Sequence, residues 1–265
     1  MNYLPKGCKG PWGFKGKRPL GYVPGMIGDT AEIEDVERLD AAIPVENQGN
    51  LSACSGFSRS AALTTDIRAK LGKSAIPDGH CIDPVTPWEV AKEIEGTDPS
   101  ANDGVQTAKS ILLAYQKLGI IGASLPLHQI GSDATSINLA LKEQSLCFAF
   151  NCFRAFFPDY LGPFGQVQEG IEINAWDMLN GGGHLIACIG MVMQQGDGRP
   201  WVYLPESWGQ QVGYRGFTTC HYDFIQPLLL EDPWCIANYD PMQDRGWEAH
   251  IVDYAWVAQQ MGRYQ

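Results

Sequence analysis

The sequence changes character sharply at Cys54. Residues 44–53 read Pro-Val-Glu-Asn-Gln-Gly-Asn-Leu-Ser-Ala and predict a loop, because residues of this kind favour turns over regular structure. Residues 55–70 contain one glycine, no proline and three alanines, which favours a helix. We therefore predict a helix that begins at or just before Cys54 and places its sulfur at a helix N-terminus.

Two more helices are predicted after this one, at residues 105–119 and 136–144. Residues 105–119 carry apolar side chains at helical spacing, with Asn102 or Asp103 as the N-cap and Gly119 near the C-terminal end. A shorter helix is predicted at 136–144, before an apolar and aromatic strand at 146–153.

The later part of the chain predicts strands. Apolar runs occupy residues 184–193 and 201–204, and the turn residues Gly196-Asp197-Gly198 between them predict a hairpin. Another strand is predicted at 214–220. Helices first and strands later indicate an α+β protein in two halves, a helical half at about 26–130 and a β half at about 131–238.

The two ends of the chain differ from this body. Residues 1–25 are rich in glycine and proline and predict an extended arm, with a short basic stretch at 15–18. Residues 239–265 are rich in aromatic side chains, which predicts that this tail docks back on the body. The arm and the tail are also the candidate surfaces for a protein assembly partner.

Charge and hydropathy exclude several classes of partner. A formal net charge of -11 and a pI near 4.8 oppose binding to the phosphates of nucleic acids. The chain contains no long apolar run, and residues 1–30 have no apolar core of a signal peptide. We therefore expect no nucleic-acid partner, no membrane partner and no secretion by a signal peptide.

The eight cysteines are scattered through the sequence and form no Cys-x-x-Cys pair, so we expect most of them to be buried free thiols. The adjacent pairs His80-Cys81 and Cys220-His221 do not make bidentate metal sites, because neighbouring strand residues point to opposite faces. We expect neither a metal nor a cofactor.

Cys54 and His184 are the candidate residues for nucleophilic chemistry. A thiol becomes a good nucleophile when a helix N-terminus or an imidazolium favours its thiolate, and the predicted helix supplies the first of these to Cys54. Of the five histidines, only His184 follows a glycine run, at 181–183, and opens an apolar strand. This arrangement favours a ring at the edge of a cleft.

Three segments in order resemble motifs of the papain-like cysteine peptidases. The segment at 48–58 has a glutamine, Gln48, six positions before the cysteine; Gly182-Gly183-His184 is similar to the histidine motif; and Ser207-Trp208-Gly209 is similar to the third motif. His184 follows Cys54 by 130 residues, near the family's interval of roughly 130–150. The resemblance covers about residues 21–238 and is strongest to the bacterial and phage-type branch, through segments such as 22–24, 103–119 and 222–224.

The resemblance implies a papain-like fold, with a helical subdomain, an antiparallel β-barrel-like subdomain and the site in the cleft between them. It implies Cys54 as nucleophile, His184 as base, Gln48 as an oxyanion donor and Trp208 as a structural shield over the histidine. It also implies a peptide or protein substrate and no cofactor.

The chain departs from the family pattern at four positions. Glu206 replaces the orienting asparagine, and a carboxylate there can accept the imidazole N–H, as in serine triads. Ser55 and Val212 replace two common aromatic residues, and Leu51 replaces a cysteine that secreted members use in a disulfide. The last change favours a cytoplasmic or virion-associated protein.

Two alternatives remain open for the function. One is a papain fold kept as a structural or binding module with little or no hydrolysis, for example in a virus particle, which the two terminal extensions and Glu206 favour. The other is an enzyme that cleaves amides of peptidoglycan with the same residues.

Overall fold

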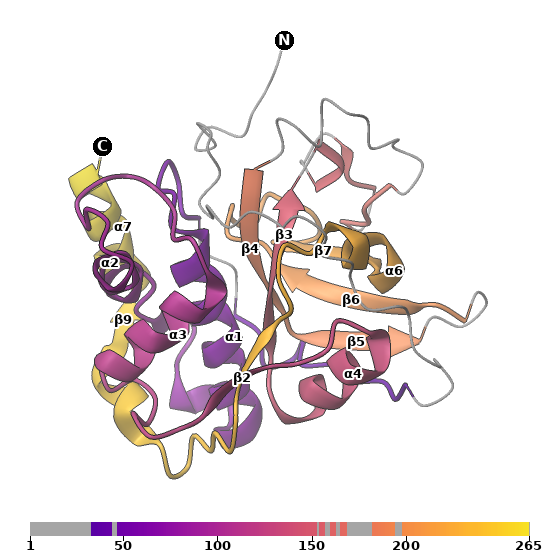
Figure 1. Cartoon of the computed structure of the whole chain (residues 1–265), viewed down its shortest axis with the longest axis horizontal. Coiled ribbons are helices and arrows are strands. Elements are labelled where there is room, and N and C mark those ends of the chain that lie inside the picture. Colours follow the sequence, from indigo (N-terminus) through magenta and orange to yellow (C-terminus); the bar gives the residue numbers. More distant parts are fainter. Residues whose placement is uncertain are drawn as a thin grey trace.

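The fold is taken from a computed structural model, shown in Figure 1. The structure describes residues 33–43, 47–152, 154–156, 160–162, 165–168, 182–193 and 198–264. The predicted arm at 1–25 and part of the predicted turn, Gly196-Asp197, lie outside the described residues.

The helical half is built around α1 (Cys54–Leu71), which confirms the helix predicted from Cys54. Most of α1 is buried, and α2 (Val85–Ile94) and α3 (Ala108–Lys117) pack near it in Figure 1. The one glycine early in α1, Gly56, lets Pro84 approach, because a methyl group there would lie 1.9 Å from the Pro84 carbonyl oxygen. Close packing against α2 therefore fixes the first turn of α1.

The predicted N-caps of α3 are wrong. The helix begins at Ala108, and the side chain of Thr107 accepts a hydrogen bond from the Ser110 N–H at 3.2 Å. Asn102 instead hydrogen-bonds the loop at 50–52, and Asp103 pairs with buried Lys92 at 3.1 Å. Asn102 and Asp103 both lie before the first turn of α3, and tertiary contacts hold their side chains away from it.

The β half contains α4 (Ala134–Glu143) and β3 (Leu146–Cys152), close to the predicted 136–144 helix and 146–153 strand. The single strand predicted at 184–193 is instead two strands, β4 (Gly182–Cys188) and β5 (Gly190–Met193). β4 pairs with β3, whereas β5 pairs with β6 (Pro200–Pro205). Gly190 permits this change of sheet, because a methyl group there would lie 2.6 Å from the Val36 carbonyl oxygen.

A three-stranded antiparallel sheet follows the order β5-β6-β7, where β7 is Phe217–His221. The pairing of β5 with β6 confirms the hairpin predicted between the apolar runs at 184–193 and 201–204. The strand predicted at 214–220 begins later, because Tyr214 and Phe217 exchange two backbone hydrogen bonds across a tight turn with Arg215 at φ 55°. The mixed helices and antiparallel sheets confirm the α+β class, and the described strands form open sheets, not a closed barrel.

The paired strands β3 and β4 divide the interior into two hydrophobic cores. Leu185 and Ala187 belong to the core that surrounds α1, whereas Ile186 and Cys188 belong to the core between β4 and the β5-β6-β7 sheet. This split follows from the two-residue period of a strand, which points successive side chains to opposite faces. β4 is therefore the wall between the two halves.

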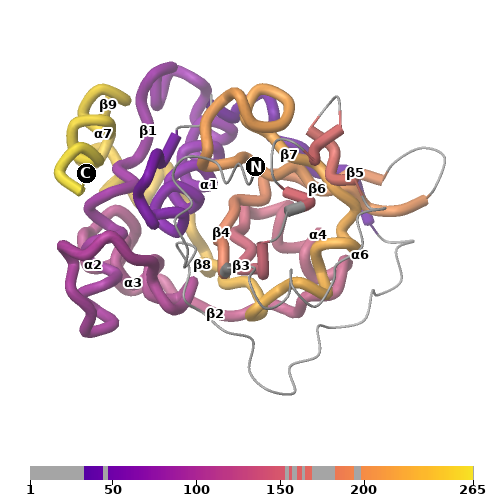
Figure 2. Tube along the Cα trace, turned by 90° about the horizontal axis from the view of Figure 1, so that it is seen from above, coloured from indigo at the N-terminus to yellow at the C-terminus, as the bar shows by residue number. Residues whose placement is uncertain are grey.

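The aromatic tail docks on the helical half, as the sequence predicts. The other α-helices and β-strands of the described residues are β1 (His80–Ile82), β2 (Leu127–Gln129), α6 (Tyr222–Ile225), β8 (Trp234–Ile236), β9 (Ile251–Asp253) and α7 (Tyr254–Met261). β9 pairs with β1, and β8 pairs with β2. Figure 2 shows α7 and β9 beside β1 and near α2.

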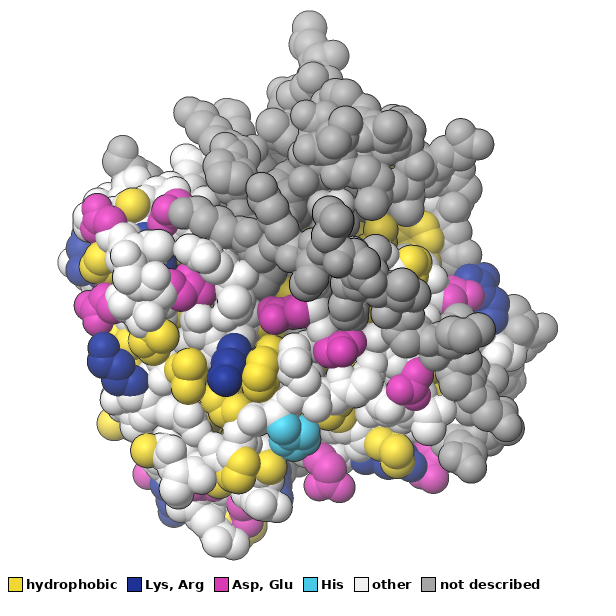
Figure 3. All heavy atoms as spheres, in the orientation of Figure 1, with side chains coloured by type: hydrophobic (Ala, Val, Ile, Leu, Met, Phe, Trp, Pro, Cys, Tyr) yellow, Lys and Arg dark blue, Asp and Glu magenta, His cyan; other side chains and the backbone are white. Residues whose placement is uncertain are grey.

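The burial of the cysteines and the character of the helices agree with what the composition predicts. The seven described cysteines are buried free thiols, as predicted for most of them, and Cys8 lies outside the described residues. Within the described ranges, no helix combines the length and apolar character needed to cross a bilayer. The face in Figure 3 shows acidic and basic side chains of described residues scattered rather than gathered.

Replacement of Trp247 tests how firmly the tail belongs to the helical core. Trp247 is 2% exposed, and its indole N–H donates to the Pro241 carbonyl at 3.2 Å. We expect Trp247→Ala to lower the free energy of unfolding by about 3–5 kcal/mol through lost burial and a cavity. Urea unfolding measures this loss, and Met242→Ala, at a 63% exposed position of the same tail, serves as the control with little change. Equal stability of both variants would contradict the docked tail.

Candidate active site

Cys54 is the first residue of α1, and its sulfur lies at the N-terminal end of that helix. Ala53 occupies the N-cap and supplies no side-chain hydrogen bond, so no cap competes for the N–H groups of the first turn. The Cys54 side chain is completely buried. The sequence thus placed the thiol correctly at the helix terminus.

α1 is joined to the edge of β4 through the backbone of Leu185. The Leu185 N–H donates to Cys54 Sγ at 3.4 Å, and its carbonyl accepts from the Ser58 hydroxyl at 2.5 Å. Cys54 and Ser58 are one helical turn apart, so both side chains face the same strand residue. These two bonds bring the sulfur next to the backbone that carries His184.

The His184 ring is held between aromatic side chains. His184 pairs with Phe150 across β3 and β4, and the two rings meet edge-on at 5.7 Å between centroids. The Trp208 ring stacks on the imidazole, with 4.9 Å between the centroids and an interplanar angle of 24°. His184 is 2% exposed, so the ring is shielded from water on the faces that these residues cover.

Glu206 follows β6 and lies beside His184. The distance from His184 Nε2 to Glu206 Oε2 is 3.9 Å, which allows an ionic attraction but is too long for a hydrogen bond. Neither carboxyl oxygen has a hydrogen-bond partner among the described residues, and the imidazole Nε2 has none either. The two groups are neighbours in the buried interior, with no hydrogen bond between Nε2 and the carboxyl.

Gln48 lies in the loop before α1 and is anchored to the third motif. Its backbone N–H donates to the Ser207 carbonyl at 2.7 Å, and its side-chain oxygen accepts from the Ser207 hydroxyl. Its side-chain nitrogen donates to the Leu51 carbonyl at 2.7 Å. These contacts fix the orientation of the amide and leave one of its two N–H donors for another acceptor.

The buried sulfur is a neutral thiol. Burial raises the pKa of Cys54 to about 12, although backbone N–H groups of Leu185, Ser55 and Cys54 itself act in the opposite direction. Those three donors are arranged to favour a negative sulfur. The loss of water on burial outweighs these three donors.

Burial also keeps the other two groups uncharged at neutral pH. It lowers the pKa of His184 to about 3 and raises the pKa of Glu206 to about 8. The Thr218 hydroxyl offsets part of the rise at Glu206, although its geometry falls short of a hydrogen bond. The described state therefore holds a thiol, a neutral imidazole and a protonated carboxyl.

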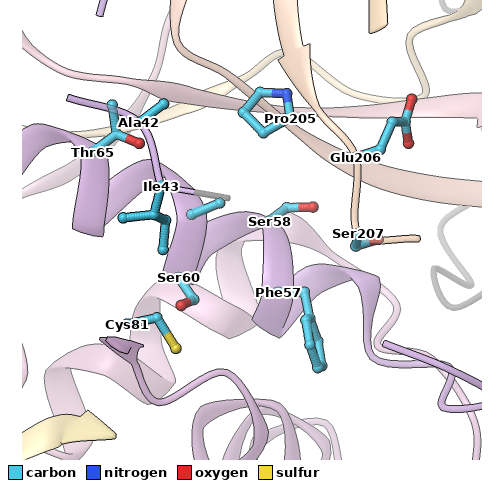
Figure 4. A pocket seen from close by; sticks show the side chains of 11 residues that line it. Ala42, Ile43, Phe57, Ser58, Ser60, Thr65, Cys81, Pro205, Glu206 and Ser207 are labelled. Atoms are coloured by element: carbon cyan, nitrogen blue, oxygen red, sulfur yellow. The ribbon is translucent and has the colours of Figure 1, made fainter. Parts of the chain in front are cut away.

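A small cavity lies beside these groups. It has a volume of about 20 Å³ and separates Phe57 and Ser58 of α1 from Pro205, Glu206 and Ser207, as Figure 4 shows. This volume suffices for a single water. Neither Cys54 nor His184 lines it, so the cavity is not a substrate cleft.

Metal chemistry finds no support in the described part of the chain. Within those residues, no group of three or more His, Cys, Asp or Glu side chains is placed to hold an ion. On β7, Cys220 is buried in the core between β4 and the β5-β6-β7 sheet. His221 packs against Trp201, with 4.1 Å between the ring centroids.

Three residues that contact the candidate site were not singled out from the sequence. Ser58 stands four residues after Cys54 in the predicted helix, and this spacing is the signal that puts both on one face. Ser207 belongs to the recognised third motif, but its bond to Gln48 joins segments far apart in sequence. Thr218 carries no local signal, because its proximity to Glu206 depends on the pairing of β6 and β7.

The chain is similar to known proteins in structure, whereas comparison of its sequence with family models and curated proteins finds no match. The cysteine protease xylellain from Xylella fastidiosa is similar in structure, with 14% identity, a TM-score of 0.59, and coverage of 90% of this chain and 100% of that one. Procathepsin L 3 of Tenebrio molitor is 16% identical with a TM-score of 0.59, covering 84% of this chain and 76% of that one.

Bromelain from Ananas comosus, solved with the E64 inhibitor, is 17% identical with a TM-score of 0.51, covering 76% of this chain and 97% of that one. The chain therefore has a papain-like fold, as the motif resemblance predicts.

The buried carboxyl gives a pH-dependent stability. Between pH 4.5 and about 8, the unfolded chain releases a proton that folded Glu206 retains, so this group lowers stability as pH rises. Its contribution is at most about 1.4 kcal/mol per pH unit and levels off above its folded pKa.

We expect Glu206→Gln to remove this slope, so that the variant gains stability relative to the parent from pH 5 to pH 8. Urea unfolding across this range measures the difference, with Glu143→Gln at an exposed carboxyl as the control. Parallel pH profiles of the parent and Glu206→Gln would show that Glu206 is not a protonated buried acid.

Proposed function

We propose that the chain is a cysteine peptidase that hydrolyses peptide bonds with Cys54 as nucleophile and His184 as base. One observation carries the proposal: a thiol at the N-terminus of a buried helix accepts a hydrogen bond from the residue directly after His184. The papain-like fold of the protease structures supports the same assignment.

The reaction needs the site to open to water and substrate. The Leu185 N–H donates the hydrogen bond to the sulfur, and catalysis requires the imidazole to come within hydrogen-bond reach of the Cys54 sulfur to take the thiol proton. The imidazolium then compensates the thiolate, and the three N–H groups that already act on the sulfur add to this stabilisation. Opening therefore converts two neutral groups into an ion pair.

The thiolate attacks the peptide carbonyl, and a sulfur–carbon bond forms as the carbonyl oxygen becomes negative. The free N–H of the Gln48 amide and the Cys54 backbone N–H stabilise this oxyanion. His184 gives its proton to the leaving amine as the carbon–nitrogen bond breaks. A water molecule, deprotonated by His184, then breaks the sulfur–carbon bond and regenerates the thiol.

Glu206 acts as the orienting group for His184 in this proposal. Its Oε2 is 3.9 Å from the imidazole Nε2, so a small movement forms a hydrogen bond. Water entering the site lowers the pKa of the carboxyl towards its ordinary value, and the carboxylate then stabilises the imidazolium. The substitution of asparagine by glutamate is thus compatible with catalysis.

A second candidate function has its own supporting observation. Cys54 and His184 are both buried, and their pKa values move away from a thiolate-imidazolium pair. A papain fold used as a binding module, without hydrolysis, would keep its site in this neutral state permanently.

Labelling by an epoxide such as E-64 distinguishes the two functions. We expect mass spectrometry to find one adduct on the peptide that contains Cys54, because an opened site carries a reactive thiolate. His184→Ala should abolish the adduct, whereas His128→Ala, at an exposed histidine, should leave it unchanged. A folded parent protein with unlabelled Cys54 would favour the binding module.

Substitution of Gln48 tests the oxyanion assignment. We expect Gln48→Ala to lower kcat on a peptide substrate by on the order of a hundredfold with little change in KM, because the donor acts mainly in the transition state. Gln243→Ala, at an exposed glutamine, is the matched control. A change in KM alone would assign Gln48 to substrate binding instead.

A further inference from the structure

The loop that carries Gln48 is attached to the β half on one side. Besides the two bonds from Gln48 to Ser207, Asn47 forms a β-bridge with Trp208. Trp208 is the residue that stacks on His184. The position of the loop is thus tied to the histidine through the third motif.

Asn102 holds the other end of the same loop. Its side-chain oxygen accepts from the Ser52 N–H at 2.7 Å, and its amide donates to the Asn50 carbonyl at 2.8 Å. Because Asn102 precedes α3, this pair of bonds attaches the loop to the helical half.

The outer side of the loop is covered by the end of the tail. Gly49 has a positive φ of 57°, and a methyl group on it would lie 3.1 Å from the terminal carbon of Met261. Met261 and Tyr264 also face Gln48, Asn50 and Leu51 across a cavity of only about 10 Å³. The tail and the loop are therefore packed together with almost no free space.

The tail end is itself fixed on α2. The Tyr264 ring meets the buried Trp88 ring edge-on at 5.2 Å between centroids, and its hydroxyl donates to Glu89. Arg263 adds a bond to the same carboxylate at 3.2 Å. α2 in turn packs on α1, so residues 261–264 link the loop to the helix that carries Cys54.

We propose that residues 261–264 are a positioning element for the Gln48 loop, with Met261 and Tyr264 as its positioning residues. They lie in the tail, outside the segment that resembles the peptidase family. They restrict the loop across the same small cavity that Asn102 lines, and so hold the Gln48 amide in the orientation that oxyanion binding needs. The inference rests on the proposed function.

Met261→Ala tests the effect on catalysis. We expect kcat to fall by about tenfold, and by less than in Gln48→Ala, with KM nearly unchanged. The loss should disappear in the Gln48→Ala background, because a positioning residue has nothing to position there. Met261→Leu, which keeps the side-chain volume, should keep the parent kcat. Met242→Ala in the same tail should leave kcat unchanged.

Hydrogen exchange of residues 47–53 tests the same idea without activity. The N–H groups of Gln48, Leu51 and Ser52 are all hydrogen-bonded, so a loosened loop exchanges them faster. Met261→Ala should raise exchange in this segment, and Met242→Ala should not.

The two measurements separate failure of this inference from failure of the proposed function. Unchanged exchange in Met261→Ala would overturn the positioning role whether or not the protein is active. Faster exchange with an unchanged kcat, in a protein that Gln48→Ala inactivates, would overturn it as well. Faster exchange in a protein without peptidase activity would support the positioning of the loop and reject the peptidase.

Discussion

The seating of α1 on the open edge of β4 is the contact on which the rest of the structure depends. Leu185 uses both of its backbone groups for this contact, one with Cys54 and one with Ser58. A strand edge left unpaired in the interior would bury unsatisfied polar groups, which costs free energy. The helix therefore satisfies the edge while it delivers the sulfur, so the same bonds serve folding and placement of the thiol.

The position of β4 between two cores explains why the site forms at this place. Alternate residues of the strand are committed to different cores, with Leu185 on the side of α1 and Ile186 on the side of the β5-β6-β7 sheet. His184 lies on the side of Phe150 and Trp208, whereas Cys54 approaches the strand at its edge. A thiol from the helical half and an imidazole from the β half can approach each other only at β4.

Local features of the sequence predicted the elements well, and tertiary contacts account for what it missed. The helix from Cys54 and the pairing of the later strands followed from composition and periodicity. The N-cap of α3 was misassigned because Asn102 and Asp103 have side chains suited to capping but are held by the 50–52 loop and by Lys92. The continuous apolar run at 184–193 hid the change of sheet at residue 189, since the residues on both sides of it are buried.

For the candidate site, motif order singled out Cys54, His184, Glu206 and Gln48 as candidates, but it carried no information on their charge states. Their charge states depend on burial, which arises only when the start of α1, β4 and the segment after β6 pack together. Charging the thiol alone, or the imidazole alone, in this interior is strongly unfavourable, because a single buried charge has no partner. Transfer of the proton from Cys54 to His184 creates both charges at once, and its cost falls when water or a polar substrate reaches them. Under the proposed mechanism, solvent access is therefore the variable that decides between a neutral pair and a charged pair.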